Sequence, residues 1–188
     1  MCGIIGYSGP KEPLPILIGG LSRLEYRGYD SAGVAILDGK KLTIEKKEGK
    51  LQVLKDHLED KKIIGNIGIG HTRWATHGIP NNINAHPHSD NQKEFAIIHN
   101  GIIENYAEMK DDLLKENYIF ESDTDTEVVA VELGNQWTGR LLETVTNVAK
   151  KLDGTYALVV TSTKEPGTIV AGRMMSPLVL GVGEGETF

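Results

Sequence analysis

The chain has 188 residues, of which 39% are hydrophobic and 24% charged, a composition typical of a globular protein with its own core. No apolar run approaches the roughly 20 residues that span a bilayer and no signal-like leader is present, so we expect no membrane role. The net charge of −6 without a basic tract argues against a nucleic-acid partner. The single cysteine cannot form an internal disulfide, which agrees with a reducing compartment and predicts a cytoplasmic protein.

The hydrophobic pattern predicts strands at both ends of the chain and helices in its middle, without regular βαβ units. Strands are expected at 4–7, 31–37, 41–47, 63–74, 95–99, 156–163, 168–171 and 178–182. Helices are expected at 14–24, 51–58, 106–116, 124–133 and 140–152. This order favours an α+β architecture in which helices cover antiparallel sheets.

Local signals refine these elements. Asp38-Gly39 predicts a hairpin between its two flanking strands, and Thr124 followed by Glu127 resembles a capping box. In the helix at 106–116 we expect Met109, Leu113 and Leu114 to face inward.

Two further stretches bear on organisation. The long polar segment 75–93 is of the kind that is usually functional or disordered. The last strand, a turn at 183–185 and a new strand beginning at 187 predict that the chain is a fragment of something longer.

The cysteine lies at position 2, where removal of Met1 would make it the N-terminus. A free α-amine titrates near about 7.7–8.0 and a thiol near about 8.5, so the amine of Cys2 could act as general base for its own thiol. A small buried hydrophobic residue is the alternative, and position 2 alone favours that alternative.

The segment 70–78 holds an arginine, two hydroxyl groups, two histidines and a tryptophan where a strand enters a loop. The planar guanidinium of Arg73 could hold a carboxylate through two hydrogen bonds. Taken singly, a surface ion pair for Arg73 and a core anchor for Trp74 are the better interpretations.

His99-Asn100-Gly101 follows an apolar strand. The Asn100 amide and the Gly101 N–H could both point at a developing oxyanion, and Gly101 would let a substrate approach the backbone. A strand-end turn is the alternative, and the dipeptide alone favours that turn.

Carboxylates at 122–127 could bind a substrate ammonium or simply cap a helix. Arg27 could orient an active site or compensate the dipole of the helix before it. His86 and His88 could form a metal pair, but without a third ligand at suitable spacing we expect no metal site.

Five motifs together are far more specific than any one of them, and they occur in this order. They are Cys-Gly-Ile-Ile-Gly at 2–6, Arg-Leu-Glu-Tyr-Arg-Gly-Tyr-Asp-Ser-Ala-Gly at 23–33, Gly-His-Thr-Arg-Trp-Ala-Thr-His-Gly at 70–78, His-Asn-Gly-Ile-Ile-Glu-Asn at 99–105 and Ser-Asp-Thr-Asp-Thr-Glu at 122–127. Over essentially the whole chain, this set resembles the glutaminase domain of the glutamine–fructose-6-phosphate aminotransferase family, a class II glutamine amidotransferase. The resemblance implies an N-terminal-nucleophile hydrolase fold, a four-layer α/β/β/α sandwich of two antiparallel sheets.

The resemblance also implies catalytic roles. Cys2 would attack the side-chain amide of L-glutamine, and its α-amine would take the thiol proton and pass one to the leaving ammonia. Asn100 and the Gly101 N–H would form the oxyanion hole. A γ-glutamyl thioester would form and then be hydrolysed to glutamate.

Substrate-binding roles follow from the same motifs. Arg73 would hold the glutamine carboxylate with Thr76 and His77 beside it, in a segment that acts as a lid. Trp74 would help to gate ammonia passage, and Arg27 would line the nucleophile pocket. Asp125 would take the α-ammonium group, with neighbouring Asp123 ranked lower.

The resemblance implies no cofactor and a full-length homo-oligomeric enzyme. Residues 1–188 would be the glutaminase domain, truncated at its C-terminal end, and the isomerase domain that binds fructose 6-phosphate and receives ammonia for glucosamine 6-phosphate synthesis would be absent. Three alternatives stay open: a class II domain of the phosphoribosyl-pyrophosphate or asparagine synthetase type, a non-enzymatic glutamine sensor, and an N-terminal-nucleophile hydrolase of another amide.

Overall fold

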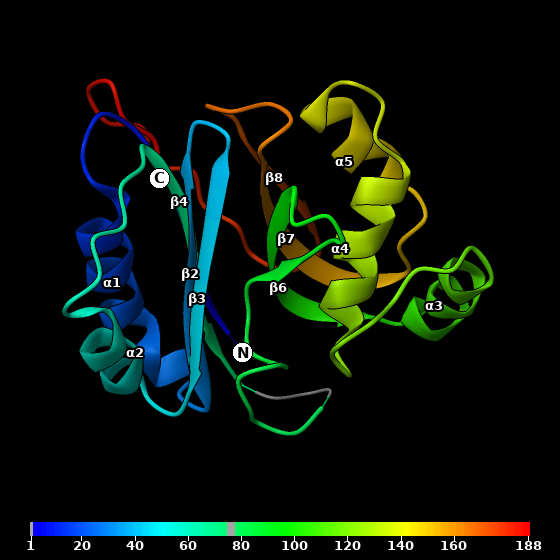
Figure 1. The fold of residues 1–188 in the computed structure, drawn as a ribbon, viewed down its shortest axis with the longest axis horizontal. Helices are drawn as coiled ribbons and strands as arrows, with labels where there is room; N and C mark the ends of the chain where they lie inside the picture. Colours follow the sequence, from blue (N-terminus) through cyan, green and yellow to red (C-terminus); the bar gives the residue numbers. More distant parts are fainter. Residues whose placement is uncertain (1, 75–77) are drawn as a thin grey trace.

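Two antiparallel sheets lie face to face between helical layers in the computed structural model, which describes residues 2–74 and 78–188 (Figure 1). The first sheet has the order β1-β4-β2-β3, with bounds Gly3–Ser8, Ile67–Arg73, Ser31–Asp38 and Lys41–Glu48. The second has the order β5-β6-β7-β8, with bounds His88–Ser89, Phe95–Ile103, Gly154–Ser162 and Ile169–Met174.

Helices cover the outer face of each sheet. Helices α1 (Pro13–Leu24) and α2 (Leu51–Leu58) pack on the first sheet, and a short 3₁₀ helix, Glu25–Arg27, follows α1. Helices α4 (Asp125–Asn135) and α5 (Leu141–Ala149) pack on the second sheet, and α3 (Tyr106–Lys115) packs on α4. The predicted α+β architecture of four α/β/β/α layers is therefore confirmed (Figure 1).

The layer between the sheets is apolar over most of its area. Its buried members are Ala35, Ile69, Ala96, Ile98 and Val159. Because side chains alternate across a strand, His71 and Arg73 share the inter-sheet face of Ile69, and Asn100 shares that of Ile98. The apolar layer therefore becomes polar at one end.

Short-range signals predicted local structure well. Asp38 pairs with Lys41, so the hairpin between β2 and β3 turns at Gly39 and Lys40. The Thr124 hydroxyl caps α4 by accepting from the Glu127 N–H at 3.3 Å, which confirms half of the capping box. The Glu127 carboxylate does not complete the box by accepting from the Thr124 N–H. It accepts two hydrogen bonds from Ser122, one from the backbone N–H and one from the hydroxyl group, each at 2.6 Å.

Predictions that depended on distant contacts were wrong in three places. The strand expected from 63 begins at Ile67, because its partner β2 offers pairing positions only from that point. No strand forms at 178–182; this segment turns back so that Thr187 bridges Ser8 at the end of β1. In α3 only Leu113 of the expected core residues is fully buried, and Leu114 is 48% exposed because it lies beyond the face that packs on α4.

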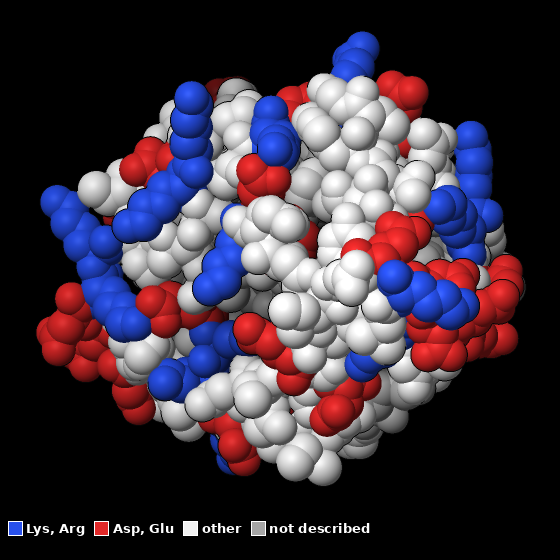
Figure 2. All heavy atoms as spheres, turned by 45° about the vertical axis from the view of Figure 1, so that its right-hand side comes forward, with Lys and Arg blue, Asp and Glu red and all other residues white. Residues whose placement is uncertain are grey.

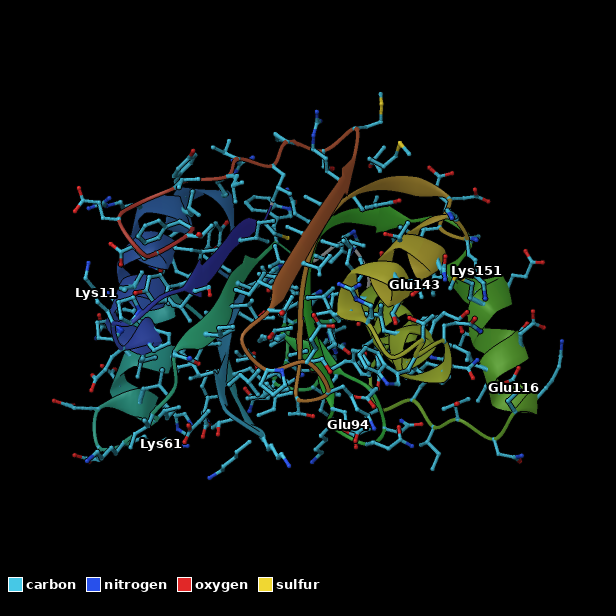
Figure 3. The ribbon with its side chains drawn as sticks, turned by 90° about the horizontal axis from the view of Figure 1, so that it is seen from above. Lys11, Lys61, Glu94, Glu116, Glu143 and Lys151 are labelled. Carbon is cyan, nitrogen blue, oxygen red and sulfur yellow. The ribbon has the colours of Figure 1, made fainter. Side chains whose placement is uncertain are left out.

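Acidic and basic side chains are interspersed on the face shown in Figure 2. Seen from above, Lys11 and Lys61 lie on the side of α1 and α2, whereas Glu143 and Lys151 lie on the opposite, helical side of the second sheet (Figure 3). Within the described segments, no helix combines the length and apolar character needed to cross a membrane.

Candidate active site

Cys2 lies directly before β1, at the polar end of the inter-sheet layer. Its backbone N–H donates to Asn100 Oδ1 at 3.0 Å, across from one sheet to the other. The Trp74 N–H donates to Cys2 Sγ at 3.4 Å, and Sγ lies 3.8 Å from the Trp74 carbonyl oxygen. The thiol is thus held where β1, β4 and β6 meet.

Burial raises the pKa of the Cys2 thiol above its ordinary value, because a desolvated site disfavours the thiolate. The backbone hydrogen bond with Trp74 and the charge of Arg73 act in the opposite direction but offset only part of this effect. The thiol is therefore protonated at neutral pH and needs a base before it can act as a nucleophile.

Asn100 and Gly101 lie inside β6, so the turn favoured by the dipeptide alone is wrong. The strand continues to Ile103 because it pairs with β7 along its whole length, which outweighs the local preference of Asn-Gly for a turn. Gly101 has φ +146°, and a Cβ there would collide with the backbone carbonyl of Thr155. The neighbouring strand, rather than an approaching substrate, is what requires glycine.

Arg73 is the last residue of β4 and is buried. Its guanidinium donates to the carbonyl oxygens of Gly78 at 3.3 Å and Ile79 at 3.5 Å, both near the upper limit for a hydrogen bond. Gly28 packs against the Arg73 backbone, where a Cβ would lie 2.7 Å from the Arg73 carbonyl oxygen. These two contacts between Arg73 and the loop that follows β4 are therefore long ones.

Asp125 is the first residue of α4 and is 4% exposed. Its Oδ2 accepts from the Ile103 N–H at 2.9 Å, and its Oδ1 accepts from the Thr126 hydroxyl at 3.2 Å. Asp123, in contrast, is exposed and exchanges hydrogen bonds with the Asn84 amide at 3.0 and 3.2 Å. The structure therefore directs the first carboxylate inward and leaves the second outside.

These side chains line one small pocket of about 20 Å³, room for one water molecule rather than an amino acid. Its lining consists of Cys2, Arg73, Trp74, His86, His99, Gly101, Thr124, Asp125 and Thr126. Asn100 is not part of this lining but accepts a hydrogen bond from the Cys2 N–H, and Arg27 lies on the 3₁₀ helix, also outside the lining. Two predicted residues, Thr76 and His77, fall outside the described segments.

Behind the pocket lies a cluster of buried histidines that the motif analysis missed: His71, His86, His88 and His99. His71 stacks on His86 with ring centroids 4.2 Å apart, and His86 meets His88 edge-on at 4.6 Å. His71 Nε2 also lies 2.9 Å from the His99 carbonyl oxygen, which links β4 to β6. A polar residue inside an apolar strand was the signal available at positions 71 and 99.

Burial disfavours a positive charge on three of these imidazoles, those of His71, His86 and His88. Burial lowers the pKa of His71 to about 3 and holds the pKa values of His86 and His88 well below their ordinary value. Within residues 2–74 and 78–188, no three histidine, cysteine or carboxylate side chains are arranged to hold a metal ion. The cluster contacts the pocket wall at Thr126, whose Oγ1 lies 2.8 Å from His86 Nε2 and 2.9 Å from His99 Nδ1.

A family model described as "Glutamine amidotransferase domain" matches residues 71–188. The chain is 53% identical over 188 residues to the glutamine–fructose-6-phosphate aminotransferase (isomerizing) of Aquifex aeolicus, a match covering 100% of this chain and 32% of that protein. It is 52% identical to the Clostridium acetobutylicum protein of the same name, again over 100% of this chain and 31% of the relative. The chain thus spans about a third of the length of the curated relatives it matches.

Solved structures agree with this assignment. The glutamine phosphoribosylpyrophosphate amidotransferase from B. subtilis, complexed with ADP and GMP, superposes with a TM-score of 0.85 at 28% identity, over 100% of this chain and 41% of that chain. A glutamine aminotransferase class-II domain protein from Silicibacter pomeroyi shares the fold, with a TM-score of 0.55 at 14% identity over 95% of this chain and 79% of that one. The fold is the N-terminal-nucleophile hydrolase fold, and the chain belongs to the glutamine amidotransferase family.

Proposed function

We propose that this chain hydrolyses the side-chain amide of L-glutamine, with Cys2 as an N-terminal nucleophile once Met1 is removed. The observation that carries the proposal is the placement of a thiol, a guanidinium and a carboxylate around one pocket, from Cys2, Arg73 and Asp125. A nucleophile beside groups of opposite charge suits a substrate that presents an amide at one end and an amino-acid zwitterion at the other.

The nucleophile needs a base because burial raises its pKa. In the proposed reaction the free α-amine of Cys2 takes the thiol proton while Sγ attacks the amide carbon. The hydrogen bond from the Cys2 nitrogen to Asn100 Oδ1 fixes the orientation of both groups.

Asn100 has a second role in the proposed reaction. Since its Oδ1 faces Cys2, its Nδ2 is the donor that remains, and it has no hydrogen-bond partner among the described residues. Together with the Gly101 N–H, it would donate to the oxyanion of the tetrahedral intermediate. Collapse of that intermediate transfers a proton from the amine to the leaving ammonia and leaves a γ-glutamyl thioester, which water hydrolyses to glutamate.

Arg73 and Asp125 would bind the two charged groups of glutamine. The pocket of about 20 Å³ must open for this, and the long bonds from Arg73 to Gly78 and Ile79 are the contacts that a substrate carboxylate would replace. Trp74 is 48% exposed and meets Tyr29 edge-on at 5.5 Å, a position from which it could gate the pocket. Arg27, Thr76 and His77 keep their proposed binding roles as predictions.

We further propose that the released ammonia goes to fructose 6-phosphate, bound by an isomerase domain of a homo-oligomeric protein. The support is the identity of 53% and 52% to aminotransferases of that name, against 28% to the phosphoribosylpyrophosphate enzyme. A cytoplasmic location is also proposed, because a nucleophilic thiol requires a reducing compartment to stay reduced.

Intact mass spectrometry with a chloroketone analogue of glutamine tests the proposed nucleophile. We expect loss of Met1 and one covalent adduct, absent in Cys2→Ala and absent when excess glutamine protects the wild-type protein. If Met1 is gone and no Cys2-dependent adduct forms, the nucleophile proposal fails and a non-enzymatic glutamine sensor becomes the better interpretation. An adduct that glutamine does not prevent would instead favour hydrolysis of another amide.

A further inference from the structure

The hydroxyl group of Thr126 makes three polar contacts in the wall of the pocket. Its Oγ1 lies 2.8 Å from His86 Nε2, 2.9 Å from His99 Nδ1 and 3.2 Å from Asp125 Oδ1. Thr126 is fully buried.

The direction of the hydroxyl proton follows from counting donors and acceptors. A hydroxyl group has one proton to donate and two lone pairs with which to accept. If the proton pointed at His86 or His99, the Asp125 contact would bring two lone-pair-bearing oxygens together without a proton between them. Only donation to Asp125, with both imidazole N–H groups donating to Thr126, gives every contact a hydrogen.

The state of His86 bears on Asp125, because Thr126 Oγ1 contacts both side chains. Burial holds the pKa of His86 well below its ordinary value, so this imidazole contributes an N–H donor rather than a positive charge. A buried imidazolium in its place would form an internal ion pair with the carboxylate. The Thr126 hydroxyl, a neutral group, therefore lies between His86 and Asp125, and His99 Nδ1 lies 3.8 Å from Asp125 Oδ2.

Both oxygens of Asp125 are fixed, Oδ1 by Thr126 and Oδ2 by the Ile103 N–H at 2.9 Å. A carboxylate has about four lone-pair sites, so each oxygen keeps a site for a further donor. We propose that Thr126, oriented by His86 and His99, is a positioning residue that fixes Asp125 to bind the α-ammonium group of the substrate. This inference rests on the proposed function, because it assumes that Asp125 binds that group.

The test compares two variants of Thr126 in the intact protein, using glutamine and its analogue without the α-amino group, 4-carbamoylbutanoate. Thr126→Val keeps the shape and removes the hydroxyl, so we expect KM for glutamine to rise about 10-fold with kcat within about 3-fold, as for one lost charge-assisted hydrogen bond. The inhibition constant of the analogue should stay unchanged, because it has no ammonium group to lose. Thr126→Ser should restore the KM for glutamine.

Matched controls separate the possible failures. Thr144→Val, in α5, removes another fully buried threonine hydroxyl, which donates to the Arg140 carbonyl oxygen at 2.9 Å. This variant should lower the stability of the protein without changing KM. If Asp125→Asn leaves KM unchanged, the proposed role of Asp125 is wrong. If Asp125→Asn raises KM and Thr126→Val does not, or if Thr126→Val weakens glutamine and the analogue equally, the positioning role is overturned. Should Thr126→Val not fold, Thr126→Ala carries the same comparison with the same outcomes.

Discussion

Gly101→Ala adds one methyl group at the point where β6 is closest to β7. The new Cβ would collide with the Thr155 carbonyl and lie 2.8 Å from Tyr156 Cα, both backbone atoms that cannot rotate away. The φ of +146° adds strain for any residue with a side chain, of about 1–3 kcal/mol. Overpacking a rigid neighbour costs a further 1–3 kcal/mol or so. The free energy of unfolding should therefore fall by about 2–6 kcal/mol, or roughly 5–20 °C in Tm for a chain of this length.

Calorimetry of two glycine variants isolates the collision from the strain. Gly139 has φ +96° and no atom within 4 Å of its position for a Cβ, so Gly139→Ala should show the strain alone. Gly19 lies within α1, also with open space, and Gly19→Ala should stabilise the protein by about 0.5–1 kcal/mol. If Gly101→Ala lowers Tm by no more than Gly139→Ala, the close approach of β7 is not the reason for glycine at position 101.

Three further predictions concern Asn100, Lys46 and Lys151. Asn100→Ala should lower kcat for glutamine hydrolysis by about 10²–10³-fold with little change in KM, measured by ammonia release; an unchanged kcat would remove Asn100 from the oxyanion hole. Burial lowers the pKa of Lys46 to about 8, so between this value and its ordinary one the folded state binds fewer protons than the unfolded state. The contribution of Lys46 to the free energy of unfolding must therefore rise with pH in that window. In urea unfolding, the free energy of unfolding of the wild-type protein relative to that of Lys46→Met should increase above pH 8. An unchanged difference would contradict the lowered pKa. Lys151→Met removes the ion-pair partner that lies 2.6 Å from the buried Glu132 carboxylate, and it should lower the free energy of unfolding in urea by about 1–3 kcal/mol. Lys115→Met breaks an exposed ion pair and should lower it by under about 0.5 kcal/mol. Equal losses would refute the distinction between buried and exposed pairs.

Local patterns predicted what local physics decides. The β2–β3 hairpin follows from a two-residue turn between alternating strands, and the Thr124 cap follows from a hydroxyl three residues before an orphan N–H. The failures have the opposite origin. Local preference predicted a turn at Asn100-Gly101, but pairing with β7 makes this dipeptide part of a strand. In the apolar run at 178–182, pairing is limited to Gly181 and Val182, which bond or bridge to Phe188 and Thr187.

The candidate site residues could be named from the motifs, but their arrangement in space could not be derived from them. Cys2, Arg73, Asn100 and Asp125 came from four separate motifs, and nothing in their spacing along the chain required one pocket. Asp123 and Asp125 were distinguishable only through the resemblance until the structure showed one exposed and the other buried. The histidine cluster was not predicted because His86 and His88 were considered only as a metal pair, and the contacts that join His71 and His99 to them connect segments that are distant in the sequence.

Strand alternation explains why these residues converge. Ile4 and Ile69 face the second sheet, so Cys2 and Arg73, each an even number of positions away, face it too. On β6 the same rule sends Asn100 toward the first sheet with Ile98, and His99 toward α4 with Ile97. The register of β1 against β4, Gly3 opposite Thr72, then sets Cys2 beside Arg73. A slip of β1 by one residue would turn Cys2 to the other face of the sheet. The pairing of the strands therefore bears on the proposed chemistry as directly as the motifs do, because the same alternation that builds the apolar layer also ends it in a thiol, a guanidinium and an amide.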